Sequence, residues 1–241
     1  MDPKVTIIIP FYNCSYVDQA IESALSQTYP NIEIIVVDDG SFLYRNKINP
    51  YLKKIKLIRK QNGGTATALN EGLKAAQGEY IAWLSSDDLY LPDRIKQQMA
   101  FMQKNNIDAS FSNYACIDEK GSITTPWSGP RLTAQHEVPK TLAIYNLING
   151  CTILFKKSIF TKYGYFNPVF RYTQDYEMWM RLITSGLKIY YYDDALTHFR
   201  QHDLSGTKKH AIEMAHEINL IEAYYRPKLI ELIFTKLSAD Q

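Results

Sequence analysis

The sequence predicts an α/β fold in which a mainly parallel central sheet is flanked by helices. In the N-terminal part of the chain, short apolar or β-branched runs alternate with segments whose apolar residues recur at helical spacing. The runs are too short for helices and apolar at nearly every position, which is typical of parallel strands buried on both faces. Strand, helix and strand in alternation predict right-handed crossovers and therefore a parallel sheet.

Length and charge limit the classes of protein that fit. The 241 residues are 46% hydrophobic, which is enough for a full-sized core. We expect one large domain, residues 1–205, followed by a helical appendage, residues 206–241. The 27 basic and 25 acidic side chains give a net charge of +2, so no electrostatic footprint for nucleic acid is visible, and nucleic acid is not an expected partner.

The cysteines and the N-terminal residues predict a soluble, cytoplasmic protein. Cys14, Cys116 and Cys151 are odd in number and far apart, with no CxxC or histidine spacing. They predict free thiols in a reducing compartment, without disulfides or zinc. Residues 1–10 lack the basic-then-apolar pattern of a signal peptide, and no apolar run approaches the length of a membrane span.

The first half of the chain is clearly patterned. Residues 5–10 form a β-branched run closed by Pro10, which predicts a buried strand that ends in a loop. Ser15 is expected to cap the helix that follows. The remaining elements expected here are strands at 32–37, 55–58, 80–84 and 109–117, and helices at 16–26, 65–76 and 92–104.

The second half is less regular. Periodicity disappears between residues 122 and 139. Beyond it we expect helices at 142–148 and 175–184, strands at 151–155, 187–192 and 195–200, and an aromatic loop at 162–172. Dense apolar positions after residue 205 predict two helices split at Pro227.

Two acidic pairs follow predicted strands directly. Asp87 and Asp88 follow the strand at 80–84, and Asp38 and Asp39 follow the strand at 32–37. Open α/β sheets bind ligands beyond the carboxyl ends of their strands, and paired aspartates there suit a hard divalent cation that also holds phosphates. The alternative is that Ser86 or Asp87 only caps the next helix. Neither GxGxxG nor GxxxxGK[ST] occurs, so the dinucleotide and P-loop fingerprints are absent.

Seven short motifs in order resemble the family 2 glycosyltransferases, inverting enzymes with the GT-A fold that use nucleotide-activated sugars. The likeness covers roughly residues 5–205. The motifs are Thr-Ile-Ile-Ile-Pro-Phe-Tyr-Asn (6–13), Val-Asp-Asp-Gly-Ser (37–41), Asn-Gly-Gly with Leu-Asn-Glu-Gly (62–64 and 69–72), Gly-Glu-Tyr-Ile (78–81), Ser-Asp-Asp (86–88), Gln-Asp-Tyr-Glu-Met-Trp-Met-Arg-Leu (174–182) and Arg-Gln-His (200–202).

The resemblance implies roles at the leaving group. It implies a divalent cation, Mn²⁺ or Mg²⁺, with Asp88 as its direct ligand and Asp87 supporting the metal or the ribose. His202 would reach the metal or the diphosphate, although without the resemblance a packed or surface imidazole is the expected reading. Asp175 would be the catalytic base, since inversion needs a carboxylate to take the acceptor's proton. Read from its position alone, Asp175 is a charge at a helix N-terminus.

The resemblance also implies a nucleotide-sugar site. Asp39 would hydrogen-bond the base, while Pro10 and Tyr12 would form the loop against which the base stacks. The other residues that the resemblance places at this site are Asn13, Asn62, Gly64, Asn70 and Ser86. It implies hexosyl or N-acetylhexosaminyl transfer, with a UDP-sugar as the favoured donor and a saccharide or lipid-linked acceptor. Bacterial polysaccharide, glycolipid or glycoconjugate assembly is the process expected from family habit.

Three positions depart from the family pattern. Ser85 stands where the family usually has Asp, Gln174 where it usually has Glu, and Leu69 where it often has Arg. The first two departures remove charge, so a weaker metal affinity is expected. A catalytically silent sugar-nucleotide-binding or assembly subunit remains an alternative. Metal-dependent nucleotidyl transfer lacks support, because no basic, glycine-rich loop follows the first strand.

The expected C-terminal helices combine apolar faces with basic residues. These basic residues are Lys208, Lys209, Arg226 and Lys228. The helices could pack on the catalytic domain, pack on a second copy to form a homodimer, or make a peripheral contact with the inner face of a membrane. Packing is favoured, because basic residues beside a helix are usually only solvated.

Overall fold

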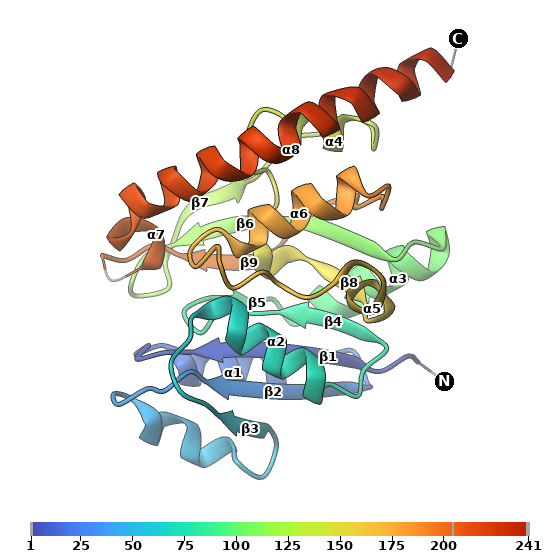
Figure 1. Cartoon of the computed structure of the whole chain (residues 1–241). Coiled ribbons are helices and arrows are strands. Elements are labelled where there is room, and N and C mark those ends of the chain that lie inside the picture. Colours follow the sequence, from blue (N-terminus) through green and yellow to red (C-terminus); the bar gives the residue numbers. More distant parts are fainter. Residues whose placement is uncertain (1, 204, 240–241) are drawn as a thin grey trace.

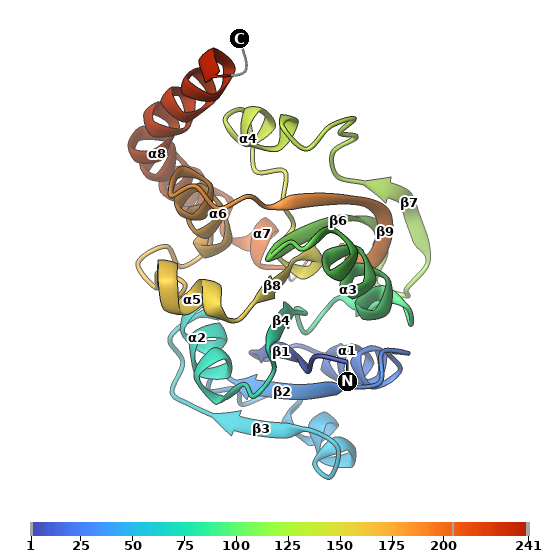
Figure 2. The ribbon, with the colours of Figure 1, turned by 90° about the vertical axis from the view of Figure 1, so that its right-hand side faces the viewer.

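The computed structural model describes residues 2–203 and 205–239, and it contains one large mixed sheet covered by helices on both faces (Figures 1 and 2). The strands are β1 (Val5–Phe11), β2 (Ile32–Asp38), β3 (Lys56–Arg59), β4 (Tyr80–Trp83), β5 (Leu89–Tyr90), β6 (Ala109–Ile117), β7 (Ile123–Ser128), β8 (Leu154–Lys156) and β9 (Tyr190–Arg200). The α-helices are α1 (Val17–Leu25), α2 (Thr65–Ala75), α3 (Arg94–Asn105), α4 (Glu137–Leu142), α5 (Ser158–Tyr163), α6 (Gln174–Thr184), α7 (Gly206–Lys209) and α8 (Ala211–Ala239), with 3-10 turns at Arg45–Tyr51 and Gly150–Thr152.

The sheet has a parallel half and a mixed half. The strand order is β3-β2-β1-β4-β8-β6-β9-β5, and β7 pairs with β6. Strands β3, β2, β1 and β4 run parallel, as the alternating pattern predicts. Beyond β4 the sheet continues through antiparallel pairs with β8, while β6 and β9 are again parallel. The carboxyl ends of β1, β2 and β4 therefore meet at one edge.

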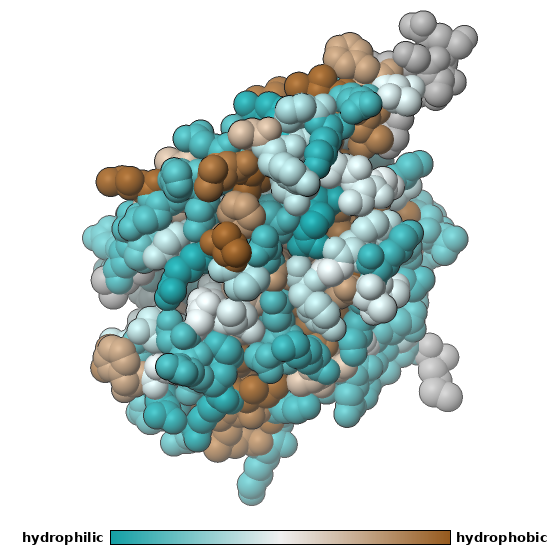
Figure 3. Space-filling view, viewed as in Figure 1, coloured by the Kyte–Doolittle hydropathy of each residue, from teal (hydrophilic) through white to brown (hydrophobic). Residues whose placement is uncertain are grey.

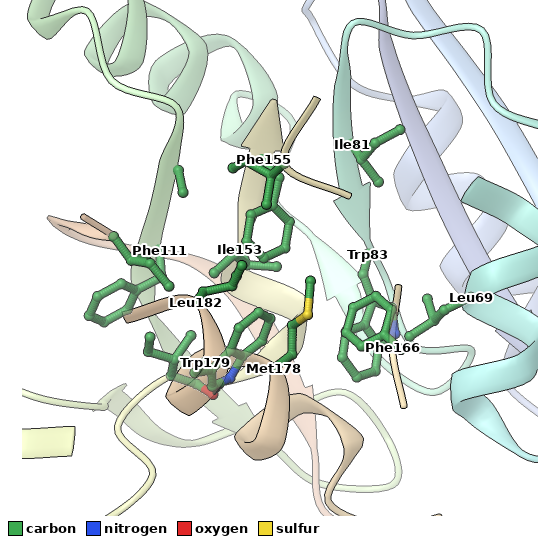
Figure 4. Packing of buried hydrophobic residues seen from close by; sticks show 14 of the residues in the cluster. Leu69, Ile81, Trp83, Phe111, Ile153, Phe155, Phe166, Met178, Trp179 and Leu182 are labelled. Carbon is green, nitrogen blue, oxygen red and sulfur yellow. Dashed lines mark hydrogen bonds between the residues drawn. The ribbon is translucent and has the colours of Figure 1, made fainter. Parts of the chain in front are cut away.

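Two hydrophobic layers cover the sheet. In β1, Ile8 belongs to the layer under α2, α6 and α8, whereas Ile7 and Ile9 belong to the layer under α1 and α3. This alternation follows from the period of two along a strand, and it explains why the run must be apolar at every position. Figure 4 shows the first layer, where the ring of Trp179 of α6 lies near those of Phe155 and Phe166.

Residues 211–239 form one long helix, α8, instead of two helices split at Pro227. The prediction of a break at Pro227 is wrong, because Pro227 lies inside α8. Ile221 and Leu229, on either side of the proline, are fully buried in the layer that includes α6. Packing on both sides of Pro227 offsets the missing backbone hydrogen bond. The packing of this helix on the catalytic elements is confirmed, and other apolar residues of α8 lie along the upper part of the face in Figure 3.

Several predicted boundaries in the second half are also wrong. The helix expected at 142–148 is instead α4, which ends at Leu142; Leu147 and Ile148 are buried without being helical. The two strands expected at 187–200 are one strand, β9, whose register against β6 shifts around residues 193 and 194. The expected strand at 151–155 begins as a 3-10 turn. Strand β7 lacks a sequence signal because it is mostly exposed.

Candidate active site

The loop after β4 carries the Asp87–Asp88 pair, and its two carboxylates have different surroundings. Asp88 is buried, with 1% of its surface exposed. Its Oδ1 accepts the backbone N–H of Arg200 at 2.9 Å, and its Oδ2 lies 3.0 Å from the thiol of Cys151. Burial, with the nearby charge of Asp87, raises the pKa of Asp88 well above its ordinary value. Asp88 thus ties together the ends of two strands.

Asp87 is the more accessible carboxylate, and it faces His202. Its Oδ2 lies 3.1 Å from Nε2 of His202, which follows the end of β9. The imidazole packs edge-on against the ring of Tyr16, with 5.3 Å between the ring centroids. The structure therefore brings together two residues 115 positions apart in the chain that the resemblance assigned to the leaving group.

The fit of this pair to a divalent cation depends on its donor atoms. A carboxylate oxygen and an imidazole nitrogen are both ligands for Mn²⁺. Within residues 2–203 and 205–239, no three His, Cys, Asp or Glu side chains gather to hold a metal by themselves. The remaining ligands would have to come from phosphate oxygens, as is usual when Mg²⁺ is bound with a nucleotide. That Asp88 binds the cation directly stays a prediction. Because the carboxylate of Asp88 is buried and already hydrogen-bonded, the more accessible Asp87 is better placed to bind the cation.

Arg200 and Cys151 support this loop, and sequence reasoning gave neither residue a role there. The buried guanidinium of Arg200 donates to the backbone oxygen of Asp87 at 2.9 Å and to Gln19 of α1 at 2.8 Å. Cys151 accepts the N–H of Ser85 at 3.2 Å, next to Asp88. In the sequence, the only indications of these roles are that Arg200 lies two positions before His202 and that Cys151 follows Asn149 and Gly150.

Asp39 directly follows β2, and neighbouring residues donate hydrogen bonds to both of its carboxylate oxygens. Its carboxylate accepts from Lys60 Nζ at 2.6 Å and from the backbone N–H groups of Gly63 and Gly64 at 3.0 and 2.8 Å. Asn62 also donates to it at 3.2 Å. These contacts order the loop after β3. Binding of a nucleotide base by Asp39 stays a prediction, and a base would have to share this carboxylate.

The loop after β1 is linked to the loop after β2. Asn13, in a left-handed conformation with φ of 49°, accepts the N–H groups of Phe42 and Leu43 at 2.9 and 2.8 Å. Tyr12 is half exposed and lies edge-on to Phe42. Pro10 is partly buried. The stacking of a base on Tyr12 stays a prediction, and the exposure of its ring is compatible with it.

Asn70 and Arg171 connect this side of the site to the aromatic loop. Both hydrogen bonds of the Asn70 side chain go to the backbone of Phe166, at 2.8 and 3.0 Å. Arg171 is exposed and donates to Oδ1 of Asn62 at 3.1 Å. Asn70 therefore anchors the loop, and Arg171 adds a positive charge beside Asn62 that sequence reasoning did not single out.

Asp175 lies in the first turn of α6, as predicted, and its pKa is set mainly by burial. Its Oδ1 accepts the N–H of Tyr176 at 2.7 Å, and Asn146 also hydrogen-bonds its side chain. Burial outweighs these bonds and raises the pKa of Asp175 to about 6, with Glu217 contributing in the same direction. The helix N-terminus therefore does not hold the pKa low, yet the carboxylate is still ionised at neutral pH.

The segment from Asn146 to Cys151 joins the two acidic centres. Asn146 contacts Asp175, and Cys151 contacts Asp88. A stretch of this length spans at most about 18 Å when fully extended. The base candidate and the Asp87–Asp88 loop are therefore linked by one short segment, although no single strand carries both.

Comparison with known proteins shows the family to which this chain belongs. A family model described as Glycosyl transferase family 2 matches residues 6–164, which is more than half of the chain. An uncharacterized glycosyltransferase of Rickettsia typhi is 37% identical over 99% of this chain and 77% of its own length. The Escherichia coli UDP-Glc:α-D-GlcNAc-diphosphoundecaprenol β-1,3-glucosyltransferase WfaP is 33% identical over 91% of this chain and 86% of its own length.

Some relatives are longer, and the structural likeness is broad. The chain spans only 36% of a Rickettsia felis relative that is 38% identical to it. The crystal structure of residues 1–349 of Staphylococcus aureus TarS with UDP-GlcNAc superimposes with a TM-score of 0.72, at 20% identity, over 90% of this chain and 65% of that one. The predicted α/β fold class is confirmed, and it is similar to GT-A glycosyltransferase structures such as TarS.

Fold and relatives thus define the class of the protein as a glycosyltransferase. Within that class, the chain belongs to glycosyltransferase family 2. The enzyme reading is confirmed, and the alternative of a silent binding subunit is not favoured.

Proposed function

We propose that this chain catalyses the inverting, cation-dependent transfer of a sugar from a nucleoside diphosphate sugar to an acceptor hydroxyl. The observation that carries the proposal is the pairing of Asp87 with His202 at 3.1 Å. A short segment, residues 146–151, links this region to Asp175. The pair suits the leaving-group side of a displacement. Asp175 suits the acceptor side, where a proton must be removed.

Asp175 is the proposed general base. Its carboxylate takes the proton of the acceptor hydroxyl while the acceptor oxygen forms a bond to the anomeric carbon. The bond from that carbon to the diphosphate oxygen breaks, and the nucleoside diphosphate leaves with the bonding electrons. A single displacement of this kind inverts the anomeric configuration and needs only one base. A pKa of about 6 leaves Asp175 ionised at neutral pH and basic enough to accept a proton.

Asp87 and His202 would hold the divalent cation. When bound, the cation would neutralise negative charge that develops on the diphosphate as it leaves. Arg200 and Asp88 would keep the loop in place through the backbone of Asp87 and through the start of the Arg-Gln-His segment. Ser85, where the family usually has an aspartate, hydrogen-bonds Cys151 and adds no negative charge.

A UDP-sugar is the favoured donor, with a hexose or N-acetylhexosamine. The printed names of the relatives support this choice, because one is a UDP-Glc transferase and one structure contains UDP-GlcNAc. The E. coli name also supports a lipid-linked saccharide acceptor and a role in polysaccharide or glycolipid assembly. None of the helices described for residues 2–203 and 205–239 is long and apolar enough to cross a membrane. Peripheral contact with the inner face of a membrane and a homodimer remain proposals.

Calorimetry with UDP, GDP and ADP, each with Mn²⁺ and with a chelator, tests this function. We expect UDP to bind best, and only with the cation, and the same UDP titration of Asp87→Asn to lose at least about tenfold in affinity, or about 1.4 kcal/mol. Asp203→Asn is the matched control, since Asp203 is exposed and follows His202 directly. Affinity unchanged by chelation would contradict the cation site. A larger loss in Asp88→Asn than in Asp87→Asn would make Asp88 the ligand.

A further inference from the structure

The carboxylate of Glu217 on α8 binds the segment that leads into the base. Its Oε1 accepts the backbone N–H of Arg171 at 2.8 Å. Its Oε2 accepts the N–H groups of Tyr172 and Thr173 at 3.0 and 2.9 Å and the hydroxyl of Thr173 at 2.7 Å. Four donors from three consecutive residues thus converge on one side chain. Asp175 follows this segment after one intervening residue.

These bonds hold the N-cap of α6 and the two residues before it. Thr173 occupies the N-cap position of α6, but its side chain makes no capping bond within the helix. N–H groups at the start of a helix have no partner in the helix itself, so they need one from elsewhere. Glu217 provides a negatively charged acceptor next to that start, where the helix dipole favours one. The N-cap of α6 is therefore fixed by a different helix.

The same segment reaches the nucleotide side of the site. The side chain of Arg171 passes the backbone of Gly64, where an added Cβ would lie 3.5 Å from it, and its guanidinium donates to Asn62. Asn62 in turn donates to Asp39. A shift of the backbone at Arg171 would therefore move the guanidinium at the nucleotide side as well as Asp175 at the acceptor side.

Helix α8 is itself firmly held, so it can serve as a support. Ile221, one turn after Glu217, is fully buried. The hydroxyl of Tyr225 donates to Glu177 of α6 at 2.8 Å, and Glu222 accepts from Tyr176 of α6 at 3.2 Å. These contacts place three side chains of α8 against α6 within two helical turns.

We propose that Glu217 is a positioning residue for sugar transfer, which holds residues 171–173 so that Asp175 and Arg171 face the site together. The inference rests on the proposed function. A carboxylate is required there because its two oxygens can accept four hydrogen bonds, whereas an amide offers only one acceptor oxygen. The helix after the catalytic elements thus becomes part of the active-site machinery.

The negative charge of Glu217 also affects the pKa of Asp175. The groups that face Asp175 are Asn146 from the loop after α4, the N–H of Tyr176 on its own helix, and Glu217 from α8. The charge of Glu217 disfavours ionisation of Asp175. Removing it should therefore move the acid limb of the rate profile to lower pH while the maximal rate falls. A purely structural loss would lower the rate without that shift.

The test compares Glu217→Gln with Glu213→Gln in the full chain. Glu213 lies one turn earlier on α8 and its side chain is 55% exposed, so it is a matched control. Hydrogen exchange of residues 171–176, UDP affinity by calorimetry, and kcat, KM and their pH dependence are measured on each. We expect about tenfold faster exchange and a kcat lowered roughly ten- to hundredfold in Glu217→Gln only, since small displacements of a base are costly. UDP affinity should change by less than about threefold.

Each result supports or overturns the proposal. Unchanged exchange in Glu217→Gln overturns it, and so does faster exchange with a kcat equal to that of Glu213→Gln. If the unaltered protein transfers no sugar to any acceptor, the proposed function fails, and exchange alone then decides whether Glu217 holds the segment. If Glu217→Gln does not fold, Thr173→Val replaces it, because this change removes one of the four donors. It should shift exchange and kcat in the same direction by a smaller factor.

Discussion

The two sides of the site are built in different ways. On the proposed nucleotide side, Asp39 directly follows β2, and its partners come from the loop after the neighbouring strand, 21 to 25 residues further along. On the base side, Asp175 depends on a segment that is held by Glu217, 44 residues beyond Thr173. Strand ends in a parallel sheet meet by topology, whereas the proposed base, Asp175, is placed by packing between helices. The base side should therefore be the more sensitive of the two to distant changes.

The largest expected effect is a slower sugar transfer in Asp175→Asn without a loss of UDP affinity. Asp175→Asn keeps the shape of the side chain but removes the base, so transfer should slow by about a hundredfold or more. The proposed UDP site does not include Asp175, so calorimetry should show a UDP affinity that is nearly unchanged. Equal transfer rates in both proteins, with an identified acceptor, would place the base on another residue.

A substitution in the core tests how much the packing of α6 depends on α8. Ile221→Ala removes a fully buried side chain from the layer between α6 and α8, which should lower the free energy of unfolding by about 2–5 kcal/mol. Chemical denaturation measures this change. Ile212→Ala on the same helix is the control, because Ile212 is 85% exposed and should cost little. Equal effects would mean that α8 is not part of the core.

The strand ends could be predicted from the sequence, whereas most of the surroundings of Asp175 could not. The runs that became β1, β2 and β4, and the acidic residues after β2 and β4, were predictable because a buried parallel strand is apolar throughout and its ligand groups follow directly. Asp175 could be placed at the start of a helix for a similar local reason. The resemblance, and not the periodicity, supplied its role.

The remaining features depend on contacts that no local pattern encodes. The continuous helix through Pro227 reflects burial of Ile221 and Leu229, which is decided by α6. The contacts of Cys151 and Arg200 with Asp88 join residues 63 and 112 positions away. The raised pKa of Asp175 likewise results from burial by elements distant in the chain. A sequence can indicate which residues have side chains suited to catalysis or metal binding. It does not indicate which of these side chains will already be hydrogen-bonded to neighbours in the fold.

A smaller effect tests the charge that links the two sides. Arg171→Gln should raise the KM for the donor by about threefold and leave kcat nearly unchanged, because an exposed guanidinium attracts a diphosphate only through a screened field. The effect should shrink as salt is added. Arg131→Gln, another exposed arginine, provides the comparison in the same kinetic assay. A kcat lowered as strongly as in Asp175→Asn would assign Arg171 a direct part in the chemistry.

The pH dependence of kcat, measured with donor, acceptor and cation all saturating, tests the central claim most directly. Asp175 must be ionised to accept a proton, and burial raises its pKa to about 6, so kcat should fall about tenfold per pH unit below that value. The residual rate of Asp175→Asn should lack this limb, and UDP affinity measured over the same range separates loss of the donor from loss of the base. A kcat that stays constant down to about pH 5, or an acid limb that persists in Asp175→Asn, would contradict Asp175 as the base.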